Sequence, residues 1–380
     1  MTHNATESTP YVAQWGILGC GWISSEFAKD LCRSPAGRGA SDISHAIVAV
    51  GSRSQAKADA FVAEFVPRGA AAQVDGLCKV EPRGHGSYAG VVNAPNVHIV
   101  YIGTTTSAHY DDARLVLEAS KHCLVEKPAT LNAAEWADLS TLAKKQGVFL
   151  MEGVWTRFNP CFLAIEKAIL HDNVIGDIRC IYSDNSLDWH NKKPDSTRML
   201  SAEQAGGSVL DLGPYPLVYT MMLMYRHPKN GLTPPAQVGS TMMLSRTGVD
   251  LASSVTLTFP QLEAIAYLTM NSLSSTPKQL HTRIVGTTGE ILIKGWTSRP
   301  SKFWIRRLVD PAEGGVFLED EEVDCAFDEF GLCFEADAVA RCVRDGLLEC
   351  PRLPHEDTLM TMGVRKQGGY EFLPGLEKVK

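Results

Sequence analysis

The chain has 380 residues, with 36 Lys and Arg against 43 Asp and Glu, and 44% of its residues are hydrophobic. This length predicts about two domains, and a formal net charge of −7 argues against a nucleic-acid partner, which normally requires a basic stripe. No apolar run approaches the roughly 18 residues of a membrane helix, and the polar start Met1–Pro10 lacks the layout of a secretory signal. We therefore expect no membrane partner and a flexible tail over residues 1–12.

Ten cysteines occur without a single C-x-x-C pair. In a long chain without a secretory signal, free thiols behave as small hydrophobes, which is typical of a reducing, cytoplasmic setting. The sequence also contains no H-E-x-x-H and no paired metal-ligand spacing, so we expect no bound metal.

The first half alternates apolar runs with helical patterns. Strands are expected at Gln14–Leu18, Ala46–Val50, Val97–Ile102, Cys123–Val125 and Val148–Met151, and helices at Trp22–Arg33, Ala56–Phe65, Asp111–Ser120 and Ala133–Gln146. Strands separated by single helices predict right-handed crossovers around a parallel sheet. Residues 13–155 are thus expected to form a doubly wound (Rossmann) domain.

The second half has a different order of predicted elements. Strand-like segments follow one another with short turns at Ser254–Pro260, Ala264–Leu273, Thr282–Ile293 (with turn residues at 287–289) and Lys302–Val309, and a helix is expected within Phe330–Asp345. Tight connections indicate antiparallel pairing. Residues 156–380 are therefore expected to form an α+β domain with an open, mostly antiparallel sheet, and Met221–Met224 should fill its core.

The first chemical motif is Gly19-Cys20-Gly21-Trp22-Ile23-Ser24, of the form G-x-G-x-x-S. Gly19 permits the tight strand-to-helix turn, Gly21 leaves room for a pyrophosphate, and Ser24 allows close packing of the helix on the strand. Trp22 and Ile23 open the helix whose N–H groups would face the phosphates. Because the motif follows a strand and opens a helix, it predicts dinucleotide binding, although a plain structural turn is an alternative.

The end of the second strand selects between NAD and NADP. Ser52-Arg53-Ser54 stands where an NAD site carries an acid for the ribose 2′-hydroxyl. A guanidinium and two hydroxyls suit a 2′-phosphate, so NADP is the expected cofactor. The distance from Gly19 to Arg53 is 34 residues, against a usual spacing of about 20, and we assign the extra length to the loop Ser34–Ser44. Alternatively, Arg53 is only a solvated surface charge.

Two further motifs carry candidate catalytic groups. Glu126-Lys127-Pro128 follows a short parallel strand, so Lys127 should point into the crevice where ligands bind. The stretch Gly206–Pro216 holds Asp211 and Tyr215 four residues apart, and they share a face if this stretch is helical. A nearby Lys127 would favour the tyrosinate and make Tyr215 a usable base, whereas the alternative for Tyr215 is a packing role.

The order of these motifs resembles the glucose–fructose oxidoreductase/inositol dehydrogenase (Gfo/Idh/MocA) superfamily. Within it, the chain is most similar to the branch of dimeric dihydrodiol dehydrogenase and fungal NADP-dependent D-xylose 1-dehydrogenase. Further matches are Trp15-Gly16-Ile17, Met151–Pro160 (that branch's M-E-A-x-W-T-R-x-x-P), Ser196–Met199 (its S-H-R-M) and Lys366–Gly369. The resemblance covers almost the whole chain.

The resemblance implies a role for each matching residue. Lys127 would contact the nicotinamide ribose and the reacting hydroxyl, with Glu126 beside it, and Tyr215 would be the acid/base. Asp211 would orient the substrate hydroxyl or Tyr215. Trp155, Arg157 and Phe158 would lie near the substrate. The family associates through the outer face of its open C-terminal sheet, so the resemblance also implies a homodimer.

Three other residues are candidates. His109 follows the loop that starts at Thr104, and both are candidates for lining the cofactor crevice; the alternative for His109 is a satisfied loop histidine. Trp189 is either an aromatic platform for a sugar or a packed loop residue.

The resemblance implies an NADP-dependent oxidoreductase that transfers hydride from C1 of an aldopyranose such as D-xylose, giving a lactone. The alternatives are oxidation of a trans-dihydrodiol, reduction of a dicarbonyl such as a deoxyosone, and a non-catalytic NADP-binding sensor or scaffold. Ala129-Thr130 after Pro128, Thr104–Thr106 in place of T-P-H, and Thr197 in place of the histidine of S-H-R-M depart from the family pattern. These departures bear on the identity of the substrate.

Overall fold

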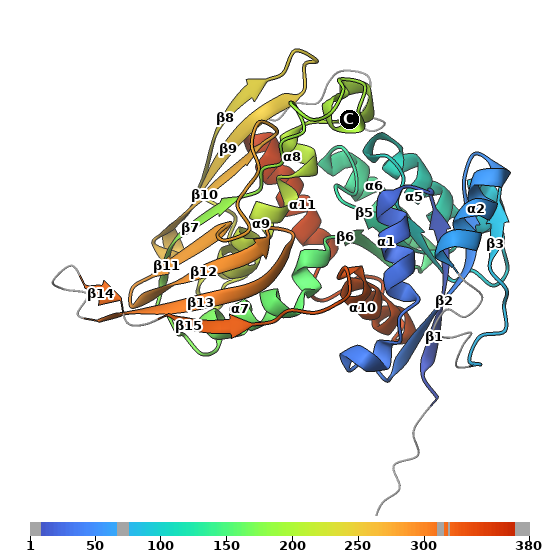
Figure 1. Ribbon diagram of the computed structural model, residues 1–380, viewed down its shortest axis with the longest axis horizontal. Coiled ribbons are helices and arrows are strands. Elements are labelled where there is room, and N and C mark those ends of the chain that lie inside the picture. The colour runs from blue at the N-terminus through green and yellow to red at the C-terminus, as the bar shows by residue number, and fades with distance from the viewer. Residues whose placement is uncertain (1–8, 67–75, 310–314, 318–319, 369–380) are drawn as a thin grey trace, which may run out of the picture.

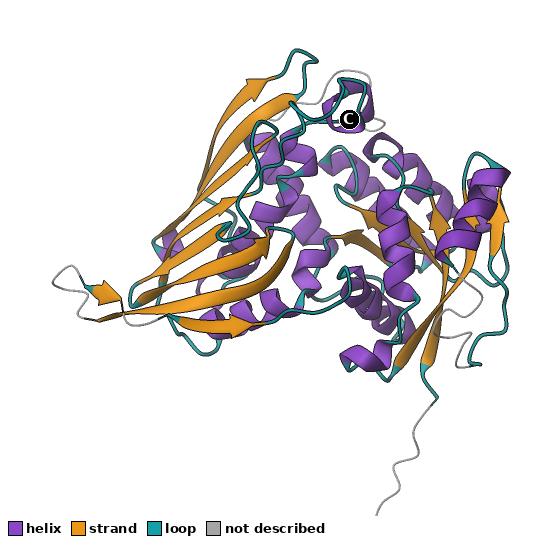
Figure 2. Cartoon of the chain, viewed as in Figure 1, coloured by secondary structure: helices purple, strands orange, loops and turns teal. Residues whose placement is uncertain are grey.

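The computed structural model describes residues 9–66, 76–309, 315–317 and 320–368. Two β-sheets lie on opposite sides of the molecule with helices between them (Figures 1 and 2). Most of the expected tail, residues 1–8, lies outside the described residues. Tyr11 and Val12, which were also assigned to the tail, belong instead to the first strand.

The first sheet has six parallel strands in the order β3-β2-β1-β4-β5-β6. The strands are β1 (Tyr11–Leu18), β2 (Ile43–Gly51), β3 (Arg83–His85), β4 (Ile99–Ile102), β5 (His122–Glu126) and β6 (Leu150–Gly153). The helices that connect them are α1 (Trp22–Leu31), α2 (Gln55–Phe65), α4 (Tyr88–Val92), α5 (His109–Glu118) and α6 (Ala133–Gln146). This order is that of a doubly wound dinucleotide-binding sheet, so the predicted fold class is confirmed.

Both faces of this sheet are buried because successive side chains of a strand point in opposite directions. In β1, Trp15 and Ile17 join one apolar core, whereas Leu18 joins the other. In β4, Tyr101 joins the first core and Val100 the second. Continuous apolar runs, rather than alternating ones, are therefore what these strands require.

The second sheet has nine strands in the order β14-β13-β12-β11-β7-β10-β9-β8, with β15 also pairing with β13. The strands are β7 (Ile178–Asp184), β8 (Gln237–Leu244), β9 (Asp250–Phe259), β10 (Ala264–Asn271), β11 (Thr282–Gly286), β12 (Gly289–Trp296), β13 (Arg299–Val309), β14 (Val316–Phe317) and β15 (Glu321–Asp324). All neighbours are antiparallel except β7 and β10. The expected open, mostly antiparallel sheet is thus confirmed.

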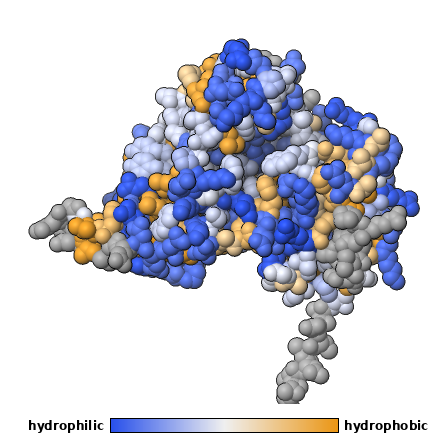
Figure 3. All heavy atoms as spheres, viewed as in Figure 1, coloured by the Kyte–Doolittle hydropathy of each residue, from blue (hydrophilic) through white to orange (hydrophobic). Residues whose placement is uncertain are grey.

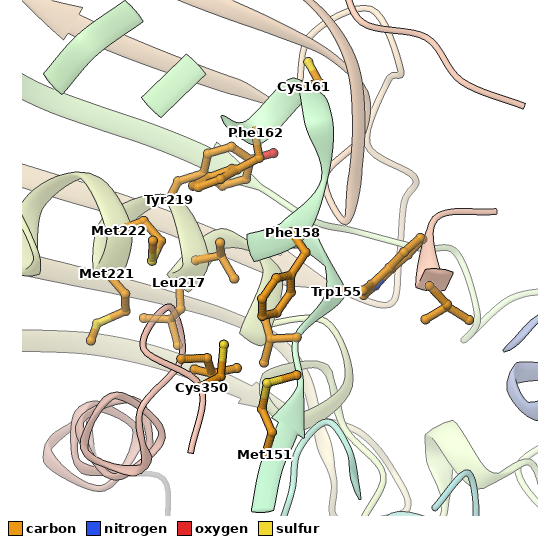
Figure 4. Packing of buried hydrophobic residues seen from close by; sticks show 14 of the residues in the cluster. Met151, Trp155, Phe158, Cys161, Phe162, Leu217, Tyr219, Met221, Met222 and Cys350 are labelled. Carbon is orange, nitrogen blue, oxygen red and sulfur yellow. The ribbon is translucent and has the colours of Figure 1, made fainter. Parts of the chain in front are cut away.

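Helices cover one face of this sheet, and Figures 1 and 2 show no described helix on its outer face. The inner face contacts α7 (Pro160–Leu170), α8 (Ser208–Asp211), α9 (Pro214–Thr220) and α11 (His355–Gln367). Met221 and Met222 follow α9 into the core, as predicted, where they lie near Leu217 (Figure 4). At the tip of the sheet, β14 exposes Val316, and hydrophobic atoms gather there (Figure 3).

The C-terminal helices return to the first sheet. The carboxylate of Asp30, in α1, accepts hydrogen bonds from the backbone N–H groups of residues 330–333, where α10 (Leu332–Arg344) begins. Asp337 of α10 accepts from Arg38 and contacts His45. In α11, Thr358 donates to Glu152 of β6. This arrangement differs from the expected assignment of all of residues 156–380 to the second domain. Within the described chain, no helix has the length and apolar character needed to cross a bilayer.

Candidate active site

The fingerprint forms the turn between β1 and α1. Gly19 has φ = +94°, and a Cβ at this position would lie 2.9 Å from the carbonyl oxygen of Gly103. Both the backbone conformation and the lack of space therefore require glycine here. Gly21 is the N-cap of α1 and provides no side-chain cap, which leaves the first N–H groups of the helix available. Trp22, 67% exposed, stands at the start of the helix, and Ile23 beside it is half-buried. The predicted strand–turn–helix context of the motif is therefore confirmed.

Ser52, Arg53 and Ser54 lie directly after β2. Ser52 is buried, Arg53 is exposed, and Ser54 caps α2 by accepting from the backbone N–H of Lys57. The extra residues between the fingerprint and Arg53 include a short 3₁₀ helix, Pro35–Arg38. Arg53 is thus an open guanidinium at the carboxyl edge of the sheet.

The loop after β4 is tied to the E-K-P turn by His109. Its ring is 1% exposed, with Nδ1 2.8 Å from the carbonyl oxygen of Pro128 and Nε2 3.4 Å from that of Thr104. Burial lowers the pKa of His109 to about 4. Thr104 donates a 2.7 Å hydrogen bond to Asp112. The ring is thus enclosed between two carbonyl groups, as expected of a satisfied loop histidine, and a contact of His109 with the cofactor stays a prediction.

Glu126 ends β5 and is buried. Its carboxylate accepts a 2.7 Å hydrogen bond from the Tyr101 hydroxyl and a 3.2 Å bond from the backbone N–H of Lys127. Burial raises the pKa of Glu126, and the Lys127 ammonium opposes this. The carboxylate therefore braces the E-K-P turn from inside the protein.

Lys127 meets Asp211 and Tyr215 across the junction of the two halves. Its Nζ donates to the carbonyl oxygen of Asp211 at 2.7 Å and to Oδ1 at 2.9 Å, and it lies 4.8 Å from the centroid of the Tyr215 ring. Asp211 and Tyr215 lie 84 and 88 positions after Lys127 in the chain, so only the fold brings them to the lysine. Asp211 ends α8 and Tyr215 lies in the first turn of α9, so two short helices replace the expected single one.

The charged forms of Lys127 and Asp211 stabilise each other. Burial alone would raise the pKa of Asp211, but Lys127 and Arg198 lower it to about 2. Burial alone would lower the pKa of Lys127, but Asp211 and its other neighbours raise it above its usual value. The ammonium and the carboxylate are therefore both charged at neutral pH.

Tyr215 departs from the expectation of a ready tyrosinate. Burial raises its pKa above the usual 10, and the nearby Lys127 ammonium offsets this only in part. The indole Nε1 of Trp155 donates a 3.3 Å hydrogen bond to the phenol oxygen. At neutral pH Tyr215 is a neutral phenol, which corrects the predicted preference for the charged form.

Of the other candidate substrate residues, only some reach this cluster. Trp155 does, and its ring stacks on Phe330 with centroids 5.0 Å apart. The guanidinium of Arg157 is 2% exposed and pairs with Asp357 at 2.5 Å, while Phe158 packs in the core (Figure 4). Trp189 packs partly against the same core. Arg157 and Phe158 are therefore held by contacts within the protein, and their place near the substrate stays a prediction.

Arg198 was not among the predicted site residues, yet its Nη2 donates to Asp211 Oδ2 at 2.9 Å. Its position in the S-T-R-M segment was the available signal. Phe330 was also missed, because nothing local to its sequence indicates the contact with Trp155. Among the described residues, no group of three His, Cys, Asp or Glu side chains is arranged to hold a metal ion.

Comparison with known proteins agrees with this geometry. Residues 13–154 match the family described as "Oxidoreductase family, NAD-binding Rossmann fold", and residues 165–292 match the GFO/IDH/MocA C-terminal domain. The chain is 34% identical to D-xylose 1-dehydrogenase (NADP(+)) of Hypocrea jecorina, over 96% of this chain and 94% of that protein. It is 31% identical to trans-1,2-dihydrobenzene-1,2-diol dehydrogenase of Danio rerio, over 94% and 98% of the two chains.

Solved structures share the fold. The 3-ketoreductase KijD10 of Actinomadura kijaniata, in complex with NADP and TDP-benzene, superposes with a TM-score of 0.71 at 21% identity, covering 92% of this chain and 94% of that one. Aldose-aldose oxidoreductase of Caulobacter crescentus gives a TM-score of 0.72 at 19% identity, with 94% and 97% coverage. The chain has the two sheets and the dinucleotide turn expected of this family, and family models match both of its halves. The chain therefore belongs to the Gfo/Idh/MocA family of oxidoreductases.

Proposed function

We propose that the protein is an NADP-dependent dehydrogenase of carbohydrate metabolism that oxidises C1 of an aldopyranose such as D-xylose. The observation that carries the proposal is the cluster of Lys127, Asp211 and Tyr215 where the two halves meet. The similarity to D-xylose 1-dehydrogenase (NADP(+)) supports this choice of substrate and cofactor. Residues 13–155 would bind the cofactor, and the second sheet would provide the substrate side.

The residues present fit NADP. The cradle at Gly19, which a Cβ would fill, and the uncapped start of α1 suit a pyrophosphate. Exposed Arg53, with the hydroxyls of Ser52 and Ser54, suits a 2′-phosphate. Lys127 would contact the nicotinamide ribose. When bound, NADP supplies the hydride acceptor at its nicotinamide ring.

The chain's own residues would move the proton. In the oxidation, the C1 hydroxyl would give its proton to the phenolate form of Tyr215 as C1 loses hydride to the acceptor, and a lactone would form. Lys127 stabilises negative charge on the reacting oxygen, and Asp211 holds the Lys127 ammonium in place. In the reverse direction the neutral phenol of Tyr215 donates the proton to the carbonyl oxygen.

A substrate panel tests this proposal. The purified protein is incubated with NADP and D-xylose, other aldoses or a trans-dihydrodiol, and with NADPH and a dicarbonyl, and NADPH and products are followed. We expect NADPH formation and a lactone or aldonic acid from D-xylose. The relatives named as diol dehydrogenases make the trans-dihydrodiol the second candidate. Binding of NADP without turnover of any compound would instead support a sensor.

We also propose a homodimer formed through the outer face of the second sheet. Tyr182 and Tyr267 lie side by side on neighbouring strands of this face, 43% and 38% exposed, with rings stacked 5.1 Å apart. Exposed aromatic pairs are typical of interfaces. Sedimentation should give a dimer mass for the wild type and a monomer mass for Tyr267→Asp, and an unchanged dimer would contradict this surface.

For localisation we propose the cytoplasm. All ten cysteines are free thiols, five of them buried in the first and second cores, which suits a reducing compartment. Fractionation of the source cells, with detection by antibody, tests this assignment.

A further inference from the structure

Arg198 occupies the open side of the catalytic cluster. Its Nη2 donates to Asp211 Oδ2, while Lys127 donates to Oδ1 of the same carboxylate, both at 2.9 Å. The Arg198 side chain is 34% exposed, against 10% for Lys127. The two cations therefore flank one carboxylate, one from inside and the other from the solvent side.

The glycine pair of the G-G-x-x-x-D motif holds Arg198 in this place. A Cβ on Gly206 would lie 2.6 Å from the carbonyl oxygen of Arg198, and Gly207 donates its N–H to the carbonyl of Met199 at 2.9 Å. Gly207 has φ = +117°, a backbone conformation that favours glycine. The loop that carries Arg198 thus packs directly on the start of α8, four residues before Asp211.

Arg198 has hydrogen-bonding capacity left for a ligand. A guanidinium has five N–H donors, and within the described residues the Arg198 side chain gives one hydrogen bond, to Asp211. Lys127 already pairs with Asp211, so Arg198 places a second cation where the cluster opens to solvent. A planar guanidinium at such a position favours an oxygen-bearing ligand.

We propose that Arg198 binds the oxygen on the carbon next to the reacting carbon, so that the site selects substrates with oxygens on adjacent carbons. This inference rests on the proposed function, in which Lys127 and Tyr215 bind the reacting oxygen. Lys127 and Arg198 bind the two oxygens of one carboxylate, so we take the two ligand oxygens that they would bind to be close neighbours. Hydroxyl groups on adjacent carbons meet this condition, and D-xylose and a trans-1,2-diol both carry such a pair.

A pair of substrates tests the role directly. The specificity constant kcat/KM is measured for D-xylose and for 2-deoxy-D-xylose, which lacks the neighbouring hydroxyl, with the wild type, Arg198→Met and Arg198→Lys. We expect the wild type to prefer D-xylose by at least 100-fold. In Arg198→Met the preference for D-xylose should fall at least tenfold. The hydroxyl next to C1 of D-xylose loses its guanidinium partner, whereas 2-deoxy-D-xylose has no hydroxyl there and loses nothing. Arg198→Lys keeps the charge without the planar fork and should lie between the two.

A parallel loss of rate with both sugars would contradict the proposed role of Arg198. If Arg198→Met and Arg198→Lys slow both sugars in parallel, Arg198 acts only by positioning Asp211, and the inference is wrong. Arg246→Met is the matched control. Arg246 is also an arginine paired with an aspartate, but its partner is Asp195, in the loop before Arg198, rather than Asp211. It should leave the preference unchanged, and thermal unfolding with NADP titration checks that each variant is folded.

Failure of the proposed function gives a different pattern. If the wild type turns over a trans-1,2-diol but not D-xylose, the diol and its mono-alcohol replace the two sugars, with the same expectations for the variants. If the wild type turns over no compound with NADP, the proposed function fails and this inference fails with it. An active wild type with a parallel loss overturns the role of Arg198 alone.

Discussion

The Lys127 ammonium lies over the face of the Tyr215 ring, 4.8 Å from its centroid, and gives its hydrogen bonds to Asp211. The cation therefore lowers the pKa of the phenol through space, while burial raises it by more. Trp155 donates to the phenol oxygen from another side. The result is a neutral phenol whose oxygen is held in place beside a fixed positive charge.

Replacing Tyr215 by Phe should remove the proton acceptor and leave the binding of NADP intact. Because a positioned acid or base contributes roughly 10²–10⁴-fold, kcat for the oxidation should fall by about that factor. Steady-state kinetics and an NADP titration measure the two effects. Near wild-type turnover in Tyr215→Phe would remove Tyr215 from the mechanism.

The rate of oxidation should depend on pH because the pKa of Tyr215 is raised. The charged phenolate is the form that accepts a proton, and its fraction grows tenfold per pH unit below the pKa. We expect kcat/KM for oxidation to rise from pH 7 to at least pH 10, while the reduction, which uses the neutral phenol, stays level over the neutral range. A plateau of the oxidation rate by pH 8 would contradict a raised pKa.

Arg53 should decide between NADP and NAD. Because charge-assisted hydrogen bonds to the 2′-phosphate would be lost, Arg53→Ala should weaken NADP binding by about 10- to 100-fold and change NAD binding by less than about threefold. Calorimetric titration gives both dissociation constants. Lys145→Ala, at an exposed site in α6, is the control, and an equal loss for both cofactors in Arg53→Ala would refute the assignment.

Asp30 should contribute to stability through the start of α10. Its carboxylate accepts from four backbone N–H groups, of residues 330–333. Asp30→Ala leaves these donors without their partner, so the free energy of unfolding should fall by about 2–4 kcal/mol. Urea denaturation measures this change. The exposed neighbour Lys29→Ala should stay within about 0.5 kcal/mol of the wild type, and equal effects of the two variants would speak against the cap.

His109 should make folding depend on pH. Its pKa is lowered to about 4 by burial, from 6.5 when unfolded. Between these values the unfolded chain binds a proton that the folded protein does not, so stability is complete above about pH 6.5 and is lost as the pH falls towards 4. As the pH falls from about 6.5 to about 4, the free energy of unfolding should therefore fall by about 3 kcal/mol more for the wild type than for His109→Gln. Parallel curves for the two proteins would exclude this contribution.

Much of the architecture follows from local sequence patterns. Continuous apolar runs predict strands buried on both faces, and β1, β2, β4 and β5 lie where they were expected within a few residues. The turn at Gly19 requires a glycine for reasons confined to a few residues, so the fingerprint identifies the nucleotide turn without help from the rest of the fold. The E-K-P and D-x-x-x-Y motifs likewise indicate Lys127, Asp211 and Tyr215.

Other features depend on residues far away in the chain. Arg157 and His109 look like ligand-binding side chains in the sequence, but Asp357 and Pro128 enclose them. The protonation state of Tyr215 could not be predicted, because burial and the Lys127 charge act in opposite directions and only the packing shows which is larger.

The two-sheet fold class, the nucleotide turn and the catalytic candidates can therefore be predicted from the amino-acid sequence, because turns and strand periodicity depend on neighbours in the chain. Three features emerge only from the folded chain: which polar groups are enclosed, the return of α10 to the first sheet, and the sharing of Asp211 by Arg198 and Lys127. Desolvation and charge pairing act through space, and their size depends on groups that the chain brings together only when it folds.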